Sequence, residues 1–122
     1  MIVKIDTKEK FHVITIQGPD IAANMTEKMD KELMALLDQK VKNVVLNLKD
    51  IKMVNKAAAI SLLRLQDLFY VRQASFVVCN LQPEVKNFFA TEDLTDLLNT
   101  APTESEAMDI IQMEEIEREM GL

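Results

Sequence analysis

The chain has 122 residues and a mass of 13.9 kDa, with 14 Lys and Arg against 20 Asp and Glu for a formal charge of -6. This length suits one domain, and a hydrophobic fraction of 48% is enough to form a buried core, which excludes a disordered chain. The negative charge argues against a nucleic-acid partner, because affinity for a phosphate backbone depends on clustered Lys and Arg.

The first elements are a predicted hairpin and a helix. Apolar residues at positions 2–5 predict a short strand, Phe11–Gln17 predicts a second, and the polar stretch between them indicates a hairpin. Asn24, with Glu27 three residues later, fits a capping box. Apolar residues then recur at helical spacing, so we expect a helix over about residues 25–39.

The middle of the chain predicts a βαβ unit. Asn43–Leu48 and Phe76–Cys79 are short, almost continuous apolar runs rich in β-branched residues, which is typical of strands covered on both faces. Between them, Ala57–Val71 is apolar around most of its circumference and predicts a long helix. Parallel strands joined by a right-handed crossover follow from this order.

The last third predicts two helices and a weak strand. Pro83 suits the first turn of a short helix, and the apolar stretch Asp96–Asn99 predicts a short edge strand. Thr103 and Glu106 form a capping box that opens the final helix. Its end, residues 113–122, is acidic, which we interpret first as a solvated helix face and second as a mobile or partner-binding segment.

Together these elements predict an α/β fold: a small mixed, mostly parallel β-sheet of four to five strands with about four helices packed against it. No linker, internal repeat or low-complexity segment divides the sequence, so we expect residues 1–122 to form a single domain.

The sequence lacks the residues that several kinds of site require. One cysteine, Cys79, and one histidine, His12, offer neither an internal disulfide nor a Cys/His metal site. Two glycines are too few for GxGxxG or P-loop phosphate binding. We interpret His12 as a half-exposed strand residue and Cys79 as a small buried hydrophobe. We expect no catalytic residue, no metal and no cofactor.

Membrane insertion and secretion are also not expected. No apolar stretch approaches the ~20 residues that cross a bilayer. The start of the chain, MIVKID, lacks the basic residues and the long apolar run of a signal peptide. We therefore expect a cytoplasmic protein.

The order and spacing of the elements resemble the STAS domain, the module named after sulphate transporters and anti-sigma factor antagonists. The resemblance covers about residues 1–112 and rests on the segments NVVLNLKDI, MVNKAAAISLLRLQ, FVVCNLQPEVKNFF and DLLNTAPTESEAM. It implies a STAS-like fold and a domain that binds protein partners without catalysis.

The phosphorylation signature of that family is altered here. Its D-S-S-G-type segment, whose first serine is phosphorylated in many antagonists, corresponds to residues 55–58. Asn55 replaces the aspartate, Lys56 replaces the serine that accepts phosphate, and Ala58 replaces the glycine. The family's G-E-L-D-type phrase is also changed, to residues 18–21 with the sequence GPDI. The resemblance thus implies partner binding without the usual serine phospho-switch, because lysine has no hydroxyl.

We expect the partner to bind where strands end and helices begin, since open α/β folds usually place their sites there. The predicted partner-binding residues are Asp20, Ile21, Ala22, Asn24, Asn55, Lys56, Ala57 and Ala58. A cation in the first helical turn is disfavoured by the helix dipole, by about 0.3–1 kcal/mol. Lys56 is therefore either a tolerated surface residue, neutralised by Asp50 or Asp20, or a cation presented to an acidic partner or a phosphate-bearing ligand.

The leading hypothesis is a stand-alone, non-catalytic domain resembling anti-sigma factor antagonists, with a kinase-like anti-sigma factor as its partner. A STAS scaffold or transporter-associated subunit is one alternative, and a module that binds a small anion or nucleotide beside Lys56 is another. The apolar long helix also allows a homodimer. Four hydroxyl residues could replace the lost phosphorylation site, and no surrounding pattern singles one out: Ser61, Ser75, Thr26 and Thr91.

Overall fold

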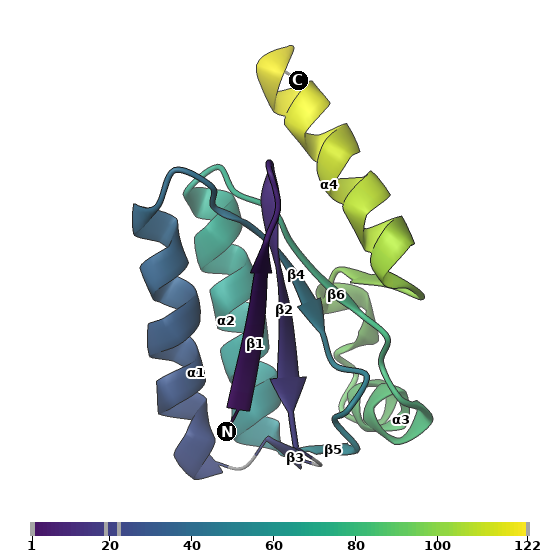
Figure 1. Cartoon of the computed structure of the whole chain (residues 1–122). Coiled ribbons are helices and arrows are strands. Elements are labelled where there is room, and N and C mark those ends of the chain that lie inside the picture. The colour runs from purple at the N-terminus through teal and green to yellow at the C-terminus, as the bar shows by residue number, and fades with distance from the viewer. Residues whose placement is uncertain (1, 19, 22, 122) are drawn as a thin grey trace.

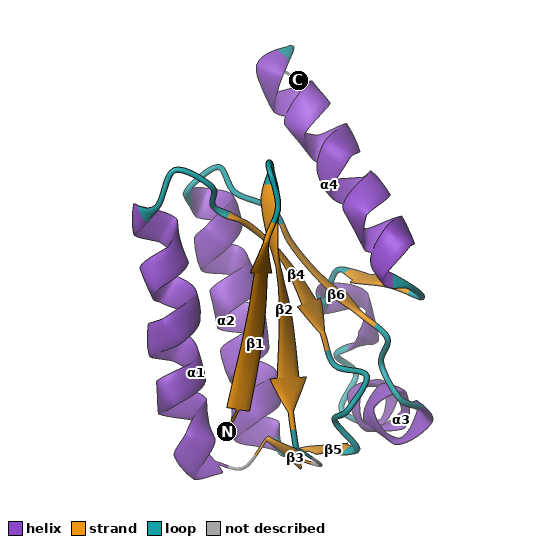
Figure 2. Cartoon of the chain, in the orientation of Figure 1, coloured by secondary structure: helices purple, strands orange, loops and turns teal. Residues whose placement is uncertain are grey.

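The structure is a computed structural model that describes residues 2–18, 20–21 and 23–121; for residues 2, 20, 23 and 24 it describes the backbone alone. Within these residues, five strands form one sheet in the order β1-β2-β4-β6-β7 (Figure 1 and Figure 2). β1 and β2 are antiparallel and the other neighbours are parallel, which confirms the predicted mixed sheet. The strands are β1 Ile2–Thr7, β2 Phe11–Gln17, β4 Asn43–Asn47, β6 Phe76–Cys79 and β7 Thr100–Ala101.

A second, two-stranded sheet lies at the end of the main sheet. β3 (Asp20–Ile21) pairs in parallel with β5 (Met53–Val54). The sequence did not predict this pair, because two residues are too few to show an alternating pattern. It ties the segment after β2 to the segment after β4, just before the helices that follow each of them (Figure 1).

Helices cover both faces of the main sheet. The helices are α1 Ala23–Ala35, α2 Lys56–Val71, α3 Pro83–Thr91 and α4 Glu104–Glu119, with 3-10 turns η1 Leu36–Asp38 and η2 Thr95–Leu97. Residues of α1, α2 and α3 share one buried cluster, and residues of α4 belong to another. Alternate residues of β4 divide between the two: Leu46 packs with α1 and α2, whereas Val45 packs with α4. This alternation follows from the two-residue period of a strand.

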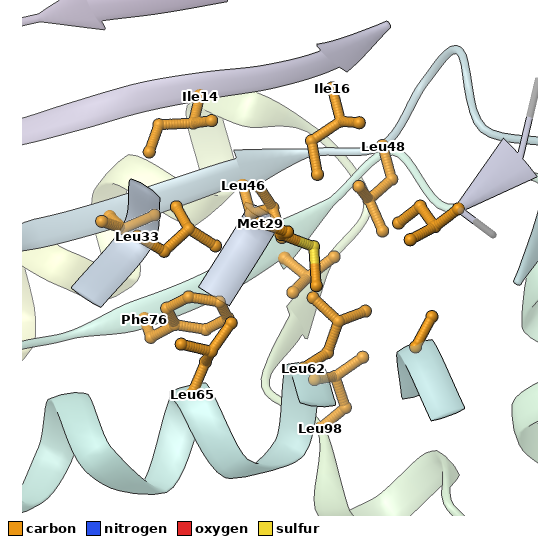
Figure 3. Packing of buried hydrophobic residues seen from close by; sticks show 14 of the residues in the cluster. Ile14, Ile16, Met29, Leu33, Leu46, Leu48, Leu62, Leu65, Phe76 and Leu98 are labelled. Atoms are coloured by element: carbon orange, nitrogen blue, oxygen red, sulfur yellow. The ribbon is translucent and has the colours of Figure 1, made fainter. Parts of the chain in front are cut away.

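The larger core lies between the sheet and the α1–α2 pair. Figure 3 shows Ile14 of β2 and Leu46 of β4 facing Met29 and Leu33 of α1, with Leu65 of α2 below them. Leu46 has no exposed surface. The continuous apolar runs of β4 and β6 are thus explained by helices on both sides of those strands.

The predicted edge strand at Asp96–Asn99 is wrong. That segment begins in η2, and the edge strand β7 follows it at Thr100–Ala101. The reason is the buried Gln66 side chain, whose Nε2 donates to the Leu97 carbonyl and whose Oε1 accepts from the Asn99 N–H, each at 2.8 Å. A side chain therefore satisfies the Leu97 carbonyl and the Asn99 N–H, and pairing with β6 begins only at the Asn99 carbonyl, which accepts from the Val78 N–H at 2.9 Å.

Two predictions about single residues also change. His12 is 2% exposed rather than half-exposed, because β1 and β4 flank β2 on both sides. Its Nε2–H donates to the Val41 carbonyl at 2.8 Å and its Nδ1 lies 2.9 Å from the Thr7 hydroxyl, which makes it a satisfied core residue. The helix expected from residue 25 begins at Ala23, so Asn24 lies inside α1 rather than at its N-cap.

Candidate functional site

The candidate site lies at the end of the molecule where β2 and β4 finish. α1 and α2 both begin there, beside the β3–β5 pair (Figure 1). Gly18, which follows β2, has φ +120°, a backbone conformation that other residues rarely adopt. The turn at Gly18 thus leads the chain out of the sheet and into β3.

Two buried apolar residues fix the base of this site. Ile21 of β3 is 1% exposed and Val54 of β5 is 5% exposed, and the two are partners in the strand register. Their burial anchors the short sheet to the main core. The backbone on either side is thereby held in place without a long strand.

A helix cap fixes the start of α2. Asn55 has extended φ and ψ of -86° and 171°, and its side-chain oxygen accepts a hydrogen bond from the N–H of Ala58 at 2.8 Å. Its carbonyl accepts from the N–H of Ala59 at 3.0 Å. Asn55 is therefore the N-cap, a position where Asn, Asp and Ser are strongly preferred.

An exposed surface follows from this geometry. We name it the α2 surface and define it by Lys52, Met53, Lys56, Ala57 and Ile60. Met53 is 69% exposed and Ile60 is 47% exposed, and the other three are exposed as well. Lys56 and Ile60 are four residues apart and so share a helix face. The α2 surface thus combines two apolar side chains with two cations.

Lys56 carries the charge nearest to the start of α2. Among the described side chains, none forms an ion pair with Lys56, and the first turn of α2 contains no acidic residue. The neutralisation by Asp50 considered above is therefore not found, and the side chain of Asp20 lies outside the description. A positive charge at this helix end is disfavoured by the dipole, so a negatively charged group brought to it would be stabilised.

One turn further along, α2 is tied to α1 by a polar cluster. The buried Ser61 hydroxyl donates to one carboxylate oxygen of Asp30, and Arg64 contacts the other at 2.7 Å. Because Ser61 is 1% exposed and already bonded, its hydroxyl faces the helix pair rather than the solvent. Of the other candidates for modification, Thr26 is half-buried on α1, Ser75 is fully buried and Thr91 is exposed.

The groups beneath the site include the Cys79 thiol and the polar pair of Asn47 and Glu104. Burial, followed by the nearby charge of Glu104, raises the pKa of the Cys79 thiol to about 12, which leaves it protonated at neutral pH. Asn47 donates to Glu104 at 3.0 Å and accepts from the Lys49 N–H at 2.9 Å. Within the described residues, no three His, Cys, Asp or Glu side chains are grouped so that they could hold a metal.

The predicted partner-binding residues fall into four groups in the structure. Asn55, Lys56 and Ala57 are exposed together at the start of α2, whereas Ile21 and Ala58 are buried and support the surface from beneath. Asp20 lies on β3 and Asn24 in the first turn of α1, with only their backbones described. Ala22 lies outside the described residues.

Met53 and Ile60 were missed by the sequence prediction. A helical wheel of α2 could have identified Ile60, because Ala58, Leu62, Leu65 and Phe69 all lie on the opposite face and are buried. No comparable signal marked Met53. Its exposure results from the two-stranded sheet, which the sequence did not predict.

The sequence of the chain was compared with family profiles and with curated proteins. The family profile described as STAS domain matches residues 3–107. A sequence search of the curated proteins gives no significant match. In the described part of the chain, no helix is both long and apolar enough to cross a membrane.

Several solved structures are similar to this chain. A putative anti-sigma factor antagonist from Thermotoga maritima has a TM-score of 0.76 at 12% identity, covering 90% of this chain and 94% of its own. The anti-sigma factor antagonist SpoIIAA in its unphosphorylated form has a TM-score of 0.72 at 18% identity, covering 91% and 96%. The murine anion transporter Solute Carrier 26 family member A9 has a TM-score of 0.68 at 16% identity, covering 84% of this chain and 18% of its own. At these identities the likeness shows a shared fold.

Proposed function

The chain belongs to the STAS domain family, and we propose that it is a non-catalytic domain that binds an anti-sigma factor through the α2 surface. The observation that carries the proposal is the exposure of Met53 and Ile60 beside Lys56, which forms no ion pair with any described side chain, at a helix start fixed by the Asn55 cap. Exposed apolar side chains that are grouped with charges mark a surface suited to a protein partner.

The chemistry of the α2 surface indicates the kind of partner surface it fits. Met53 and Ile60 supply apolar area, and methionine adapts easily to the shape of a partner. Lys52 and Lys56 supply positive charge near the positive end of the α2 dipole. The complementary surface is apolar at its centre and carries carboxylates at its edge.

We further propose that serine phosphorylation does not control binding at the start of α2. Lys56 occupies the position of the phosphate-accepting serine and has no hydroxyl. Ser61 is buried and donates to Asp30, so a phosphate there would break the contact between α1 and α2. Control would then act through the amount of the partner or through a different residue.

The fold shared with part of the murine anion transporter supports a second candidate, a domain that associates with a transport protein. Both candidates use the α2 surface, and the identity of the partner separates them. A third outcome, binding of a small anion beside Lys56, requires no protein partner.

The experiment is capture of proteins from the native cell by the immobilised full chain, with identification by mass spectrometry. The test variant is Lys56→Glu with Ile60→Glu. The matched control is Lys4→Glu with Val71→Glu: Lys4 is an exposed lysine on β1, and Val71, 76% exposed, lies on the same face of α2 as Ile60 but at its other end.

We expect the wild type and the control to retain a kinase-like anti-sigma factor and the test variant to lose it. Recovery of membrane transport subunits under the same conditions would replace the first candidate with the second. Equal capture by the test variant would show that the α2 surface is not the binding site. A thermal shift with inorganic phosphate or a nucleotide, and no captured protein, would favour the small-anion module.

A further inference from the structure

Helix α4 exposes apolar side chains on the face opposite to its buried one. Ala107 and Ile111 are fully buried against the sheet. Met113, Ile116 and Met120 are 61%, 55% and 66% exposed, and we name them the outer stripe of α4. At 100° per residue, these three side chains fall within about 60° of one another, roughly opposite Ala107 and Ile111.

Polar contacts fix the rotation of α4, so the outer stripe cannot turn inward. Glu115 accepts a hydrogen bond from Asn43 at 2.7 Å and from Arg118 at 3.0 Å. Arg118 also donates to the Ser75 hydroxyl at 2.8 Å. On the neighbouring side, Tyr70 of α2 donates to Glu114 at 2.7 Å. The helix is held on the sheet along its second half.

The exposed charges that α4 itself carries around the outer stripe are negative. Asp109, Glu117 and Glu119 are exposed residues of α4. Arg118 is the one basic residue of this helix, and it is engaged with Glu115 and Ser75 on the inner side. Asp109, Glu117 and Glu119 form no ion pair with any described side chain, so positive charge from a partner could pair with them.

A groove adjoins the stripe. Its volume is about 250 Å³, and Ile116 belongs both to its lining and to the stripe. The other lining residues are Lys10, Ile111, Gln112, Glu115 and Glu119. A cavity of this size beside an exposed apolar row can receive one large apolar side chain of a docked segment.

We propose that the outer stripe of α4 docks a basic amphipathic helix of another protein, with its apolar residues on the stripe and its Lys or Arg side chains against Asp109, Glu117 and Glu119. A second copy of this chain fits less well, because two α4 helices would bring their own carboxylates together. An anionic membrane is repelled by the same charges. This surface is separate from the α2 surface: α4 lies on the other face of the sheet and runs away from the β3–β5 end (Figure 1).

The probe is a synthetic amphipathic helical peptide of leucine and lysine, added to the full chain and followed by fluorescence anisotropy at low and high salt. The test variant is Met113→Gln with Ile116→Gln. Its matched control is Met34→Gln with Ile5→Gln, which removes two apolar side chains of similar exposure from other elements, 46% and 48%. A second test variant, Glu117→Lys with Glu119→Lys, changes the charge and leaves the stripe intact.

We expect the peptide to bind the wild type and the control alike, and each test variant to weaken binding by about tenfold or more, as loss of anchor residues does at interfaces. High salt should weaken wild-type binding. Thermal unfolding of each variant shows whether it is folded, and Lys56→Glu should leave peptide binding unchanged, which separates this surface from the α2 surface.

Three results would overturn the proposal. One is equal peptide binding by the wild type and the Met113→Gln, Ile116→Gln variant, or no binding by either. Another is a dimer in sedimentation that this variant converts to a monomer, which would identify a second copy of the chain as the occupant. The third is binding of the wild type, but not the variant, to vesicles containing phosphatidylglycerol.

Discussion

The side-chain oxygen of Asn55 lies 2.8 Å from the backbone nitrogen of Ala58 and accepts its hydrogen bond. Asn55, which the resemblance places at the family's signature aspartate, is thus the N-cap of α2. Asparagine and aspartate cap helices about equally well, so the helix start is fixed by Asn55 whether or not the next residue carries a hydroxyl, and here that residue is Lys56. The shape of the site and its capacity for phosphorylation are therefore separate properties of this segment.

The cap makes a direct prediction about stability. Asn55→Ala removes the acceptor of the Ala58 N–H and should lower the free energy of unfolding by about 1 kcal/mol. Asn55→Asp keeps an acceptor and should leave stability within about 0.5 kcal/mol of the wild type or raise it through the dipole. Urea denaturation at neutral pH measures both. Equal stability of Asn55→Ala and the wild type would show that the cap contributes nothing.

The contacts of Glu115 predict a dependence of stability on acid pH. The hydrogen bond from Asn43, with the hydrogen bond and charge of Arg118, holds the pKa of Glu115 below its ordinary value of 4.5. A carboxyl group with a lowered pKa in the folded state stabilises the fold above its unfolded pKa, and that stabilisation is lost as the pH falls through the folded pKa.

The measurement compares the wild type with Glu115→Gln from pH 7 down to pH 3. We expect the wild type to be the more stable at pH 7, and the difference between the two proteins to shrink below about pH 4.5. Glu117→Gln, at an exposed position of the same helix, is the control. A difference that is constant over this range would mean that Glu115 is not held as a carboxylate by Asn43 and Arg118.

The phosphorylation state gives a third prediction. Incubation of the full chain with a cognate anti-sigma kinase and ATP should leave residues 55–58 unmodified, because this segment contains no hydroxyl. Ser61 should also stay unmodified, since it is buried and bonded to Asp30. Mass spectrometry of the digested protein decides the matter. Phosphate on Ser61 or Thr26 would show that the switch has moved rather than disappeared.

Lys56 gives a prediction in which stability and affinity change in opposite directions. Lys56→Glu replaces a cation with an anion at the positive end of α2, so the isolated chain should gain about 0.5–1 kcal/mol. Affinity for the captured partner should fall, and the loss should diminish at high salt if the partner contact is acidic.

Calorimetric titration measures this affinity, and Lys4→Glu on β1 is the control for a general change in net charge. An unchanged affinity of Lys56→Glu at low salt would make Lys56 a tolerated surface residue. Equal losses for Lys56→Glu and Lys4→Glu would mean that the net charge of the chain, rather than this position, governs association.

The sequence predicted the elements whose pattern is long enough to repeat. Asn43–Asn47 and Phe76–Cys79 were recognisable because strands covered on both faces need apolar residues at nearly every position. β3 and β5 were not, because they are two residues long and are held by tertiary contacts. His12 was misplaced for a related reason: a single polar residue does not reveal that its partners are Thr7 and Val41.

The sequence named only some of the side chains that the structure exposes at the candidate site, whose role in binding stays a prediction. Asn55, Lys56 and Ala57 could be named from the altered signature, whereas the exposure of Met53 and Ile60 depends on how β5 and α2 meet. Ala58 was named with them, yet it faces the core, because it lies two residues after Lys56 and so points to nearly the opposite side of the helix. A linear motif therefore predicts position along the chain but not which side chains reach the surface.

The most direct test of the α2 surface is methyl NMR of the full chain with and without the captured anti-sigma factor. We expect the methyl signals of Met53 and Ile60 to show the largest changes on binding, while those of Met34 on α1 and Ile5 on β1, which are also exposed, stay near their free positions. Unchanged Met53 and Ile60 signals in a complex that shifts Met34 or Ile5 would contradict binding through the α2 surface.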